Sequence, residues 1–233
     1  MSEAEGIPEN QEQNPQQASK PQEEEQPLNI KIVLVGDDGV GKTSICAYYK
    51  DGKSPSTGLP IILPNFAKKE TYMGQKAILV LWDSACNEDY NEIRPIGYKN
   101  ANFFFLCFAL NNKKSLENAE NIWLKEISPF AKEAKVILVG TKRDIQTLTD
   151  SQISSFRYRI NPYLYVECST RSGENVQQIF DNVVKITIEP NSIPKQMFED
   201  PNKPNIILNN NENADKKETE GITKHKSTTC LLI

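Results

Sequence analysis

Apolar and polar positions follow two patterns along the chain, one typical of buried β-strands and the other of amphipathic helices. Continuous apolar runs occupy residues 102–110 and 135–140. A β-branched stretch at 29–35 is polar at first and apolar at its end, and a further strand-like stretch lies at 163–169. Runs of this length, rich in β-branched and aromatic residues, are typical of strands that are covered on both faces, as in a parallel sheet. The pattern therefore predicts a sheet built mainly from parallel strands.

Helical patterns lie between these strands. Helices are predicted over residues 41 to about 50, 115–130, about 149–159, and 173–188. Ser115 is expected to be the N-cap of the second of these helices, because its hydroxyl can accept a backbone N–H of the first turn. The last helix has one apolar face. Its apolar residues stand at positions 176, 179, 180, 183, 184 and 186.

Two further strand-like stretches, NFAKKETY at 65–72 and KAILVLWD at 76–83, flank Met73-Gly74-Gln75. A glycine between two such stretches is typical of a hairpin turn, so these strands are expected to be antiparallel neighbours. Strands that alternate with helices are typical of an α/β fold. The sequence thus predicts an α/β domain whose sheet is mostly parallel and contains one antiparallel hairpin.

Charge and polarity divide the chain into a central domain and two tails. Residues 1–28 carry seven acidic residues and one lysine, and residues 191–233 carry six acidic residues and six lysines. Segments this polar cannot bury a core, so both tails are expected to be disordered. The folded domain is predicted to span residues 29–190. The acidic N-terminal extension is interpreted as a spacer, with a partner-binding arm as the alternative.

Composition excludes several classes of protein. The only histidine, His225, lies in the C-terminal tail, so catalytic triads and zinc-protease motifs have no histidine in the predicted domain. The apolar run at 103–110 is far shorter than the roughly 20 residues that span a bilayer, and the acidic N-terminus does not resemble a secretory signal. Five cysteines without a C-x-x-C motif favour a reduced, cytoplasmic protein. The domain is too weakly basic to favour nucleic acid as a partner.

Residues 36–43, GDDGVGKT, have the spacing G-x-x-x-x-G-K-[ST] between a predicted strand and a predicted helix. In this context the motif is typical of a loop whose backbone N–H groups, together with the helix N-terminus, bind phosphate groups. Lys42 can reach the β- and γ-phosphates of a nucleotide, and Thr43 can hold Mg²⁺. The phosphate-binding candidates are Asp38, Gly39, Val40, Gly41, Lys42, Thr43 and Ser44.

Two later stretches favour guanine as the base. TKRD at 141–144 follows a predicted strand, and Asp144 can accept both the ring N–H and the exocyclic N–H₂ of guanine, a donor pair that adenine lacks. Lys142 can lay its aliphatic stem along the base, and a backbone N–H in ECST at 167–170 could meet the guanine oxygen. An ATP-using phosphate-loop enzyme is an alternative that Asp144 disfavours. The guanine-binding candidates are Thr141, Lys142, Asp144, Ser169 and Thr170.

These residues resemble the Ras superfamily of small GTP-binding proteins and, within it, the Rho family. Besides GKT, the stretches that carry the resemblance are LWDSACNEDYNEIRPIGY at 81–98, FFLCFAL at 104–110, ILVGTKRD at 137–144 and ECS at 167–169. The resemblance covers about residues 30–188. It implies a six-stranded, mostly parallel sheet with helices on both faces, and binding of GTP or GDP with Mg²⁺ held by Thr43 and Asp83. Rho proteins carry an extra helix after the TKxD motif, for which this chain has no room, because Cys168 follows Asp144 by only 24 positions.

Four positions depart from the family pattern that the resemblance provides. Asp38 stands where the family has glycine, and its carboxylate would crowd the γ-phosphate and repel a triphosphate. Ile61 replaces the threonine of the first switch loop that holds Mg²⁺. In the second switch loop, Cys86 replaces a glycine, and Asn87 replaces the glutamine that orients the attacking water. With Lys42 and Asn87 as catalytic candidates, the sequence predicts a GTPase with impaired hydrolysis. The alternative is a guanine-nucleotide scaffold that does not switch, because it is locked to GTP or binds without Mg²⁺.

The chain ends in CLLI at 230–233, which has the form of a prenylation box with Cys230 as the lipid acceptor. One lipid beside a weakly basic tail gives reversible membrane contact. We therefore expect a monomeric cytoplasmic protein that binds the cytoplasmic face of the plasma membrane through a farnesyl or a geranylgeranyl group. The resemblance also implies effector proteins, an exchange factor and a GDI-like chaperone as partners.

Overall fold

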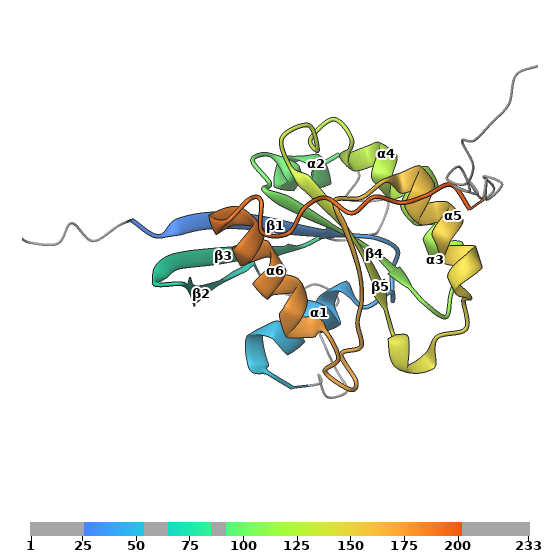
Figure 1. The fold of residues 1–233 in the computed structure, drawn as a ribbon, viewed down its shortest axis with the longest axis horizontal. Helices are drawn as coiled ribbons and strands as arrows, with labels where there is room; N and C mark the ends of the chain where they lie inside the picture. The colour runs from blue at the N-terminus through green and yellow to red at the C-terminus, as the bar shows by residue number, and fades with distance from the viewer. Residues whose placement is uncertain (1–25, 54–64, 85–91, 202–233) are drawn as a thin grey trace, which may run out of the picture. The chain divides into compact units, whose positions relative to one another are not determined.

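A six-stranded sheet lies between two layers of helices in the computed structural model, which describes residues 26–53, 65–84 and 92–201 (Figure 1). The strand order is β2-β3-β1-β4-β5-β6, and only β2 and β3 pair in antiparallel fashion. This arrangement confirms the predicted α/β fold with a mostly parallel sheet. The strands are β1 (Leu28–Val35), β2 (Phe66–Tyr72), β3 (Gln75–Asp83), β4 (Phe103–Ala109), β5 (Lys135–Thr141) and β6 (Leu164–Glu167).

The helices include one composite element. The α-helices are α1 (Lys42–Asp51), α2 (Arg94–Tyr98), α3 (Lys113–Asn118), α4 (Leu124–Ile127), α5 (Asp150–Ile160) and α6 (Val176–Ile188). A π-helical segment, η2 (Ala119–Trp123), joins α3 to α4, so the helix predicted over 115–130 consists of three parts. A 3₁₀ turn, η3 (Arg143–Ile145), follows β5. In the described part of the chain, no helix is long and apolar enough to cross a bilayer.

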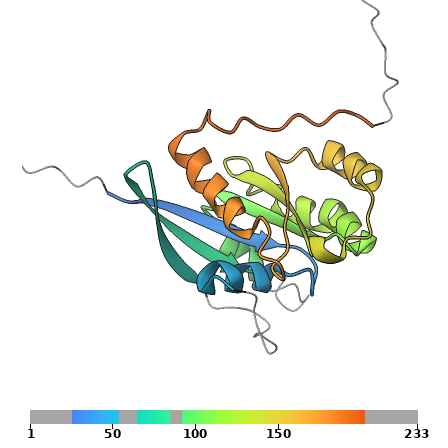
Figure 2. The same cartoon turned by 60° about the horizontal axis from the view of Figure 1, so that its bottom comes forward.

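Beyond α6 the chain stays in contact with the domain as far as Phe198, past the boundary expected at 190. Figure 2 shows this stretch, in orange-red, running on from the end of α6; residues 189–198 are called the edge segment below. The backbone N–H of Gln196 donates to the carbonyl of Tyr163 at 2.9 Å, and its side-chain oxygen accepts the N–H of Tyr165 at 2.8 Å. These bonds pair groups on the outer edge of β6, which would otherwise be available to another chain. Arg157 of α5 stacks on the rings of both Tyr165 and Phe198.

Alternate side chains of the central strands fill two hydrophobic cores, one on each face of the sheet. On β1, Ile32 and Leu34 join the core that α1 and α6 cover. Val33 and Val35 join the second core, which is covered by the helices from α2 to α5. Because both faces of the strand are covered, its sequence is apolar at consecutive positions. The six apolar positions predicted for the last helix are all buried in the first core.

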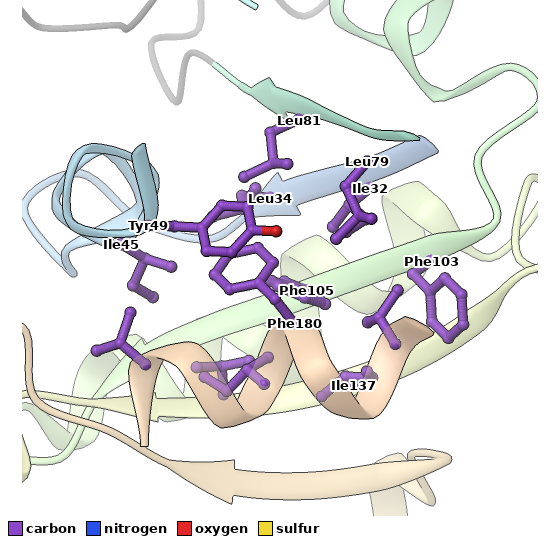
Figure 3. Packing of buried hydrophobic residues seen from close by; sticks show 14 of the residues in the cluster. Ile32, Leu34, Ile45, Tyr49, Leu79, Leu81, Phe103, Phe105, Ile137 and Phe180 are labelled. Atoms are coloured by element: carbon purple, nitrogen blue, oxygen red, sulfur yellow. The ribbon is translucent and has the colours of Figure 1, made fainter. Parts of the chain in front are cut away.

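The first core contains two stacked rings, Tyr49 of α1 and Phe180 of α6 (Figure 3). Their centroids lie 3.7 Å apart with an angle of 18° between the ring planes, and Phe105 of β4 lies 5.5 Å from Phe180. The hydroxyl of Tyr49 donates to Glu70 of the edge strand β2 at 2.6 Å. The helix that carries the candidate phosphate loop at its N-terminus is therefore fixed to the sheet, to α6 and to β2.

The helix after β4 begins differently from the prediction. Asn112 is the N-cap, because its side-chain oxygen accepts the backbone N–H of Ser115 at 3.3 Å. Ser115 is buried, and its hydroxyl donates to the carbonyl of Asn112 and accepts from the N–H of Ala109. The prediction of Ser115 as N-cap was wrong because both residues suit that position locally. The contact with the end of β4 decides between them.

The last helix begins at Val176 rather than at 173, because residues 169–175 fold into a loop. Gly173 in this loop has a φ of +81°, and a Cβ there would overlap the hydroxyl of Tyr48 on α1. β6 likewise ends at Glu167, two residues before the predicted end of the strand. The residues that were predicted to belong to this strand and this helix instead form the loop that carries part of the candidate site.

The edge segment is expected to stabilise the domain. A chain that ends after Pro190 should unfold at a lower temperature than one that ends after Pro201, because it lacks both hydrogen bonds of Gln196 and the packing of Ile193. Two hydrogen bonds of about 1 kcal/mol each correspond to a decrease in Tm of roughly 4–8 °C. Differential scanning calorimetry of the two chains measures the difference, and equal midpoints would contradict the prediction.

Candidate nucleotide-binding site

The loop between β1 and α1 has a backbone shape that requires its glycines. Gly36 begins the loop with a φ of +145°, and a Cβ there would overlap the carbonyl oxygen of Cys107 on β4. Gly39 and Gly41 also have positive φ angles, of +67° and +105°. These conformations favour glycine, which alone lacks the Cβ that makes them strained. The loop can therefore turn directly from the end of β1 into the N-terminus of α1.

Lys42 is buried in this loop, with only 5% of its surface exposed. Its Nζ donates to the carbonyls of Gly36 and Asp37, at 2.8 Å each, so the loop's own backbone holds the ammonium. α1 begins at Lys42, has no acidic residue in its first turn, and is not capped by a side chain of the described residues. Ser44 lies half-buried in that first turn. The N-terminus of a helix beside a buried ammonium favours an anion here.

Asp38 lies exposed in the loop, where its Oδ1 accepts the backbone N–H of Gly39 at 2.9 Å. The carboxylate thus occupies one of the amide groups that the motif is expected to offer to phosphate. The predicted repulsion between Asp38 and a γ-phosphate stays a prediction. The structure adds a second effect, since a phosphate oxygen would have to displace this carboxylate to accept the N–H of Gly39.

Thr43 and Asp83 lie together beside the loop, and the hydroxyl of Thr43 donates to Oδ2 of Asp83 at 2.7 Å. Asp83 ends β3 and is 8% exposed, whereas Thr43 belongs to the first turn of α1. Hydroxyl and carboxylate oxygens suit Mg²⁺, which usually completes its coordination with water and substrate phosphates. In the described part of the chain, no group of three or more His, Cys, Asp or Glu residues could hold a metal. The two predicted ligands therefore fit an ion that arrives with a phosphate ligand.

Two residues of the TKRD stretch join the base-reading side of the site to the phosphate loop. The hydroxyl of Thr141, at the end of β5, donates to the carbonyl of Val40 and lies 3.1 Å from the carbonyl oxygen of Phe108. Lys142 has a left-handed φ of +59°, and its Nζ donates to the carbonyl of Gly39 at 2.6 Å. The aliphatic stem of Lys142 consequently spans the two loops, as contact with a base between them requires.

Asp144 and Ser169 come together from two different loops. The hydroxyl of Ser169, which is fully buried, donates to Oδ1 of Asp144 at 2.6 Å. The backbone N–H groups of Arg171 and Ser172 donate to the same hydroxyl oxygen, at 3.2 and 3.3 Å. Arg171 also approaches the other carboxylate oxygen of Asp144, at 3.7 Å. These contacts orient the carboxylate that is predicted to select guanine, and the half-buried Thr170 follows directly after Ser169.

Three cysteines lie buried among these elements: Cys46 of α1, Cys107 of β4, and Cys168 after β6. Burial raises the pKa of the Cys46 thiol well above its ordinary value and raises the pKa of Cys168 to about 12. Thiols with such pKa values remain protonated near neutral pH and are poor nucleophiles. The described cysteines therefore act as small core residues.

The sequence missed one pair of contacts in the loop. The carboxylate of Asp37 accepts hydrogen bonds from the side-chain nitrogens of Asn118, at 2.8 Å, and Trp123, at 2.7 Å. An acidic residue in an anion-binding loop is a signal that donors are needed nearby, but its partners lie more than 80 positions away. Four other predicted residues fall outside the described part of the chain: Ile61, Cys86, Asn87 and Cys230.

Comparison with known families identifies a match over most of the domain. The model of the Ras family matches residues 31–189 of the chain. The matched range covers more than half of the sequence. It includes the phosphate loop, the TKRD stretch and Ser169, which are the three parts of the site described above.

Asp144→Ala is expected to lower the affinity for GTP and GDP by roughly 10²–10⁴-fold. Two hydrogen bonds to an ionised group contribute about 1.5–3 kcal/mol each, and the variant loses both. Any affinity for ATP should not fall, because adenine does not offer the donor pair. Titration with fluorescent analogues of the guanine nucleotides and of ATP measures these affinities. The matched control is Asp150→Ala, at the exposed start of α5. An equal loss for GTP and ATP would contradict the assignment.

Proposed function

Because the chain belongs to the Ras family of small GTP-binding proteins, we propose that it acts as a Rho-type switch at a membrane, with slow intrinsic GTP hydrolysis. Members of this family bind GTP or GDP, typically together with Mg²⁺. The observation that carries the slow hydrolysis is the carboxylate of Asp38, which lies in the phosphate loop and accepts the N–H of Gly39.

The described residues account for how a nucleotide would be bound and oriented. Lys42 and the N–H groups of the loop bind the phosphates, and Asp144 selects the base. Thr43 and Asp83 would hold Mg²⁺, which offsets the negative charge of the phosphates. In hydrolysis a water attacks the γ-phosphate and the bond to the β-phosphate oxygen breaks. The protein accelerates this step by positioning and by charge, so small changes in the loop affect the rate.

Asp38 opposes hydrolysis through its charge. Two like charges about 5 Å apart repel by about 3 kcal/mol at an effective dielectric constant of about 20. Asn87 adds to this effect, because it stands in place of a glutamine and its amide is one methylene shorter. Asp38 lies in a different loop from Asp144, which is predicted to select the base. A protein with these features binds GTP and hydrolyses it slowly to GDP. It would therefore remain in the GTP-bound form for a long time.

The Rho-type assignment is supported by the sequence, above all by residues 81–98. The described chain between Asp144 and β6 contains α5 as its only α-helix, so an extra Rho helix has no counterpart there. We therefore propose effector proteins, an exchange factor and a GDI-like chaperone whose binding does not depend on that helix.

A second candidate function is a guanine-nucleotide scaffold that does not switch. Asp38 already fills one donor of the loop, and Ile61 and Cys86 replace residues that the family uses to sense the γ-phosphate. Such a protein would be locked to GTP, or it would bind without Mg²⁺ and be indifferent to the γ-phosphate. The dependence of GTP affinity on Mg²⁺ separates a switch from the Mg²⁺-independent form of the scaffold, because the switch loses affinity when the ion is removed and this scaffold does not.

Asp38→Gly is expected to raise the single-turnover rate of GTP hydrolysis by at least about tenfold, because the variant removes both the charge and the bulk of the side chain. Asp38→Asn separates the two causes, since it keeps the size and removes the charge. Release of inorganic phosphate from protein preloaded with GTP measures all three rates. The proposal fails if the unaltered chain already turns over as fast as Asp38→Gly.

Cys230 is expected to carry a prenyl group that holds the protein reversibly at the cytoplasmic face of the plasma membrane. Full-length protein from a eukaryotic host should be heavier by the mass of one farnesyl or geranylgeranyl group, and part of it should sediment with membranes. Cys230→Ser should have the unmodified mass and remain in the supernatant. Intact-mass spectrometry that finds an unmodified Cys230 would rule the lipid out.

A further inference from the structure

The phosphate loop contains two consecutive carboxylates, and they lie in different environments. Asp38 is exposed, whereas Asp37 is half-buried. A carboxylate that loses contact with water needs hydrogen-bond donors, or its burial costs several kcal/mol. In a loop that binds phosphate, donors that turn the carboxylate outward also remove a competing anion from the site.

Asp37 has two such donors, and both come from the composite helix after β4. The Nδ2 group of Asn118, the last residue of α3, donates to Oδ2 at 2.8 Å. The Nε1–H of Trp123, the last residue of η2, donates to Oδ1 at 2.7 Å. Each carboxylate oxygen thus has its own donor. Hydrogen bonds to an ionised group are stronger than those between neutral groups.

The π-helical segment explains how one helix supplies both donors. In an α-helix, residues five positions apart lie about 140° apart around the axis, so they face different sides. In a π-helical turn the hydrogen bonds run from i to i+5, so residues five positions apart lie one turn apart on nearly the same side of the helix. η2 places Trp123 on the side of Asn118, and both side chains reach Asp37.

Trp123 also contacts α2, through the face of its ring. The guanidinium of Arg94 lies 4.9 Å from the centre of the indole ring and makes two hydrogen bonds with Glu126, at 2.7 and 2.9 Å. The hydroxyl of Tyr98 donates to the same carboxylate at 2.8 Å. Only 5% of Trp123 is exposed. The indole N–H is therefore pre-positioned for Asp37.

We propose that Asn118 and Trp123 are positioning residues that hold the carboxylate of Asp37 away from the phosphates and thereby slow the release of nucleotide. The backbone carbonyl of Asp37 also accepts from Nζ of Lys42, so the same contacts fix part of the cradle of this lysine. Without the two donors, the carboxylate competes with the phosphates for Lys42 and for the loop's N–H groups. The proposal rests on the nucleotide binding that the family supports.

The rate of release of a fluorescent GDP analogue from full-length protein tests this role. Trp123→Phe removes the indole N–H and keeps an aromatic ring for Arg94, and Asn118→Ala removes the other donor. Each substitution is expected to accelerate release by about tenfold, the equivalent of one hydrogen bond to a charged group. Trp82→Phe on β3, whose ring lies under Lys31, is the matched control and should leave the rate unchanged.

A second background separates positioning from a general loss of structure. If the freed carboxylate causes the acceleration, then Trp123→Phe and Asn118→Ala should have no further effect in a chain that carries Asp37→Ala. Asn118→Asp should accelerate release of the analogue more than Asn118→Ala does, because it places a second carboxylate beside that of Asp37. Combining Asn118→Asp with Asp37→Asn should restore slow release, since donor and acceptor are exchanged. This rescue keeps the test valid even where a single variant unfolds.

The inference is overturned if Trp123→Phe releases the analogue as slowly as the unaltered chain, or if it accelerates release equally in the Asp37→Ala background. Failure of nucleotide binding itself gives a different result. In that case the unaltered chain would not retain the GDP analogue at all.

Discussion

Two hydrogen bonds hold the halves of the nucleotide site together, from Thr141 to the carbonyl of Val40 and from Lys142 to the carbonyl of Gly39. The phosphate loop follows β1 and the base-reading loop follows β5, and these strands are not neighbours, because β4 lies between them. The two bonds cross the end of β4. They set the distance between the place for the phosphates and the place for the base, so the site depends on them.

Three carboxylates close to this edge of the sheet have different roles, which their hydrogen-bond partners decide. Asp144 is oriented by the hydroxyl of Ser169 and is predicted to select guanine. Asp37 is turned away from the loop by side chains of the helix after β4. Asp38 accepts the neighbouring N–H of Gly39. The same chemical group thus supports base selection, stabilises the loop, and opposes hydrolysis in the proposed function.

The sequence predicted those features of the fold and of the site that depend on a few adjacent residues. The glycines of the phosphate loop need their φ angles and close approaches wherever the loop is placed, and the apolar runs need burial on both faces. Met73 and Gly74 form the predicted turn between β2 and β3, both with positive φ. Such features follow from a few adjacent residues, and the structure confirms them.

Contacts between distant residues could not be predicted in the same way. Both Asn112 and Ser115 suit an N-cap, and only Ala109 of β4 decides which residue takes that position. Nothing local shows that Gln196 will pair with the edge of β6, or that a helix will contain a π-helical segment. The donors for Asp37 were missed for the same reason, since no local pattern connects the loop with that helix.

The central claim is that this pocket binds a guanine nucleotide, and equilibrium binding tests it most directly. The affinities of purified full-length protein for GDP, GTP and ATP should be measured at a fixed Mg²⁺ concentration. We expect GDP and GTP to bind at micromolar concentrations or below, and ATP to bind far more weakly. Retention of neither guanine nucleotide, or equal affinity for ATP and GTP, would contradict the account.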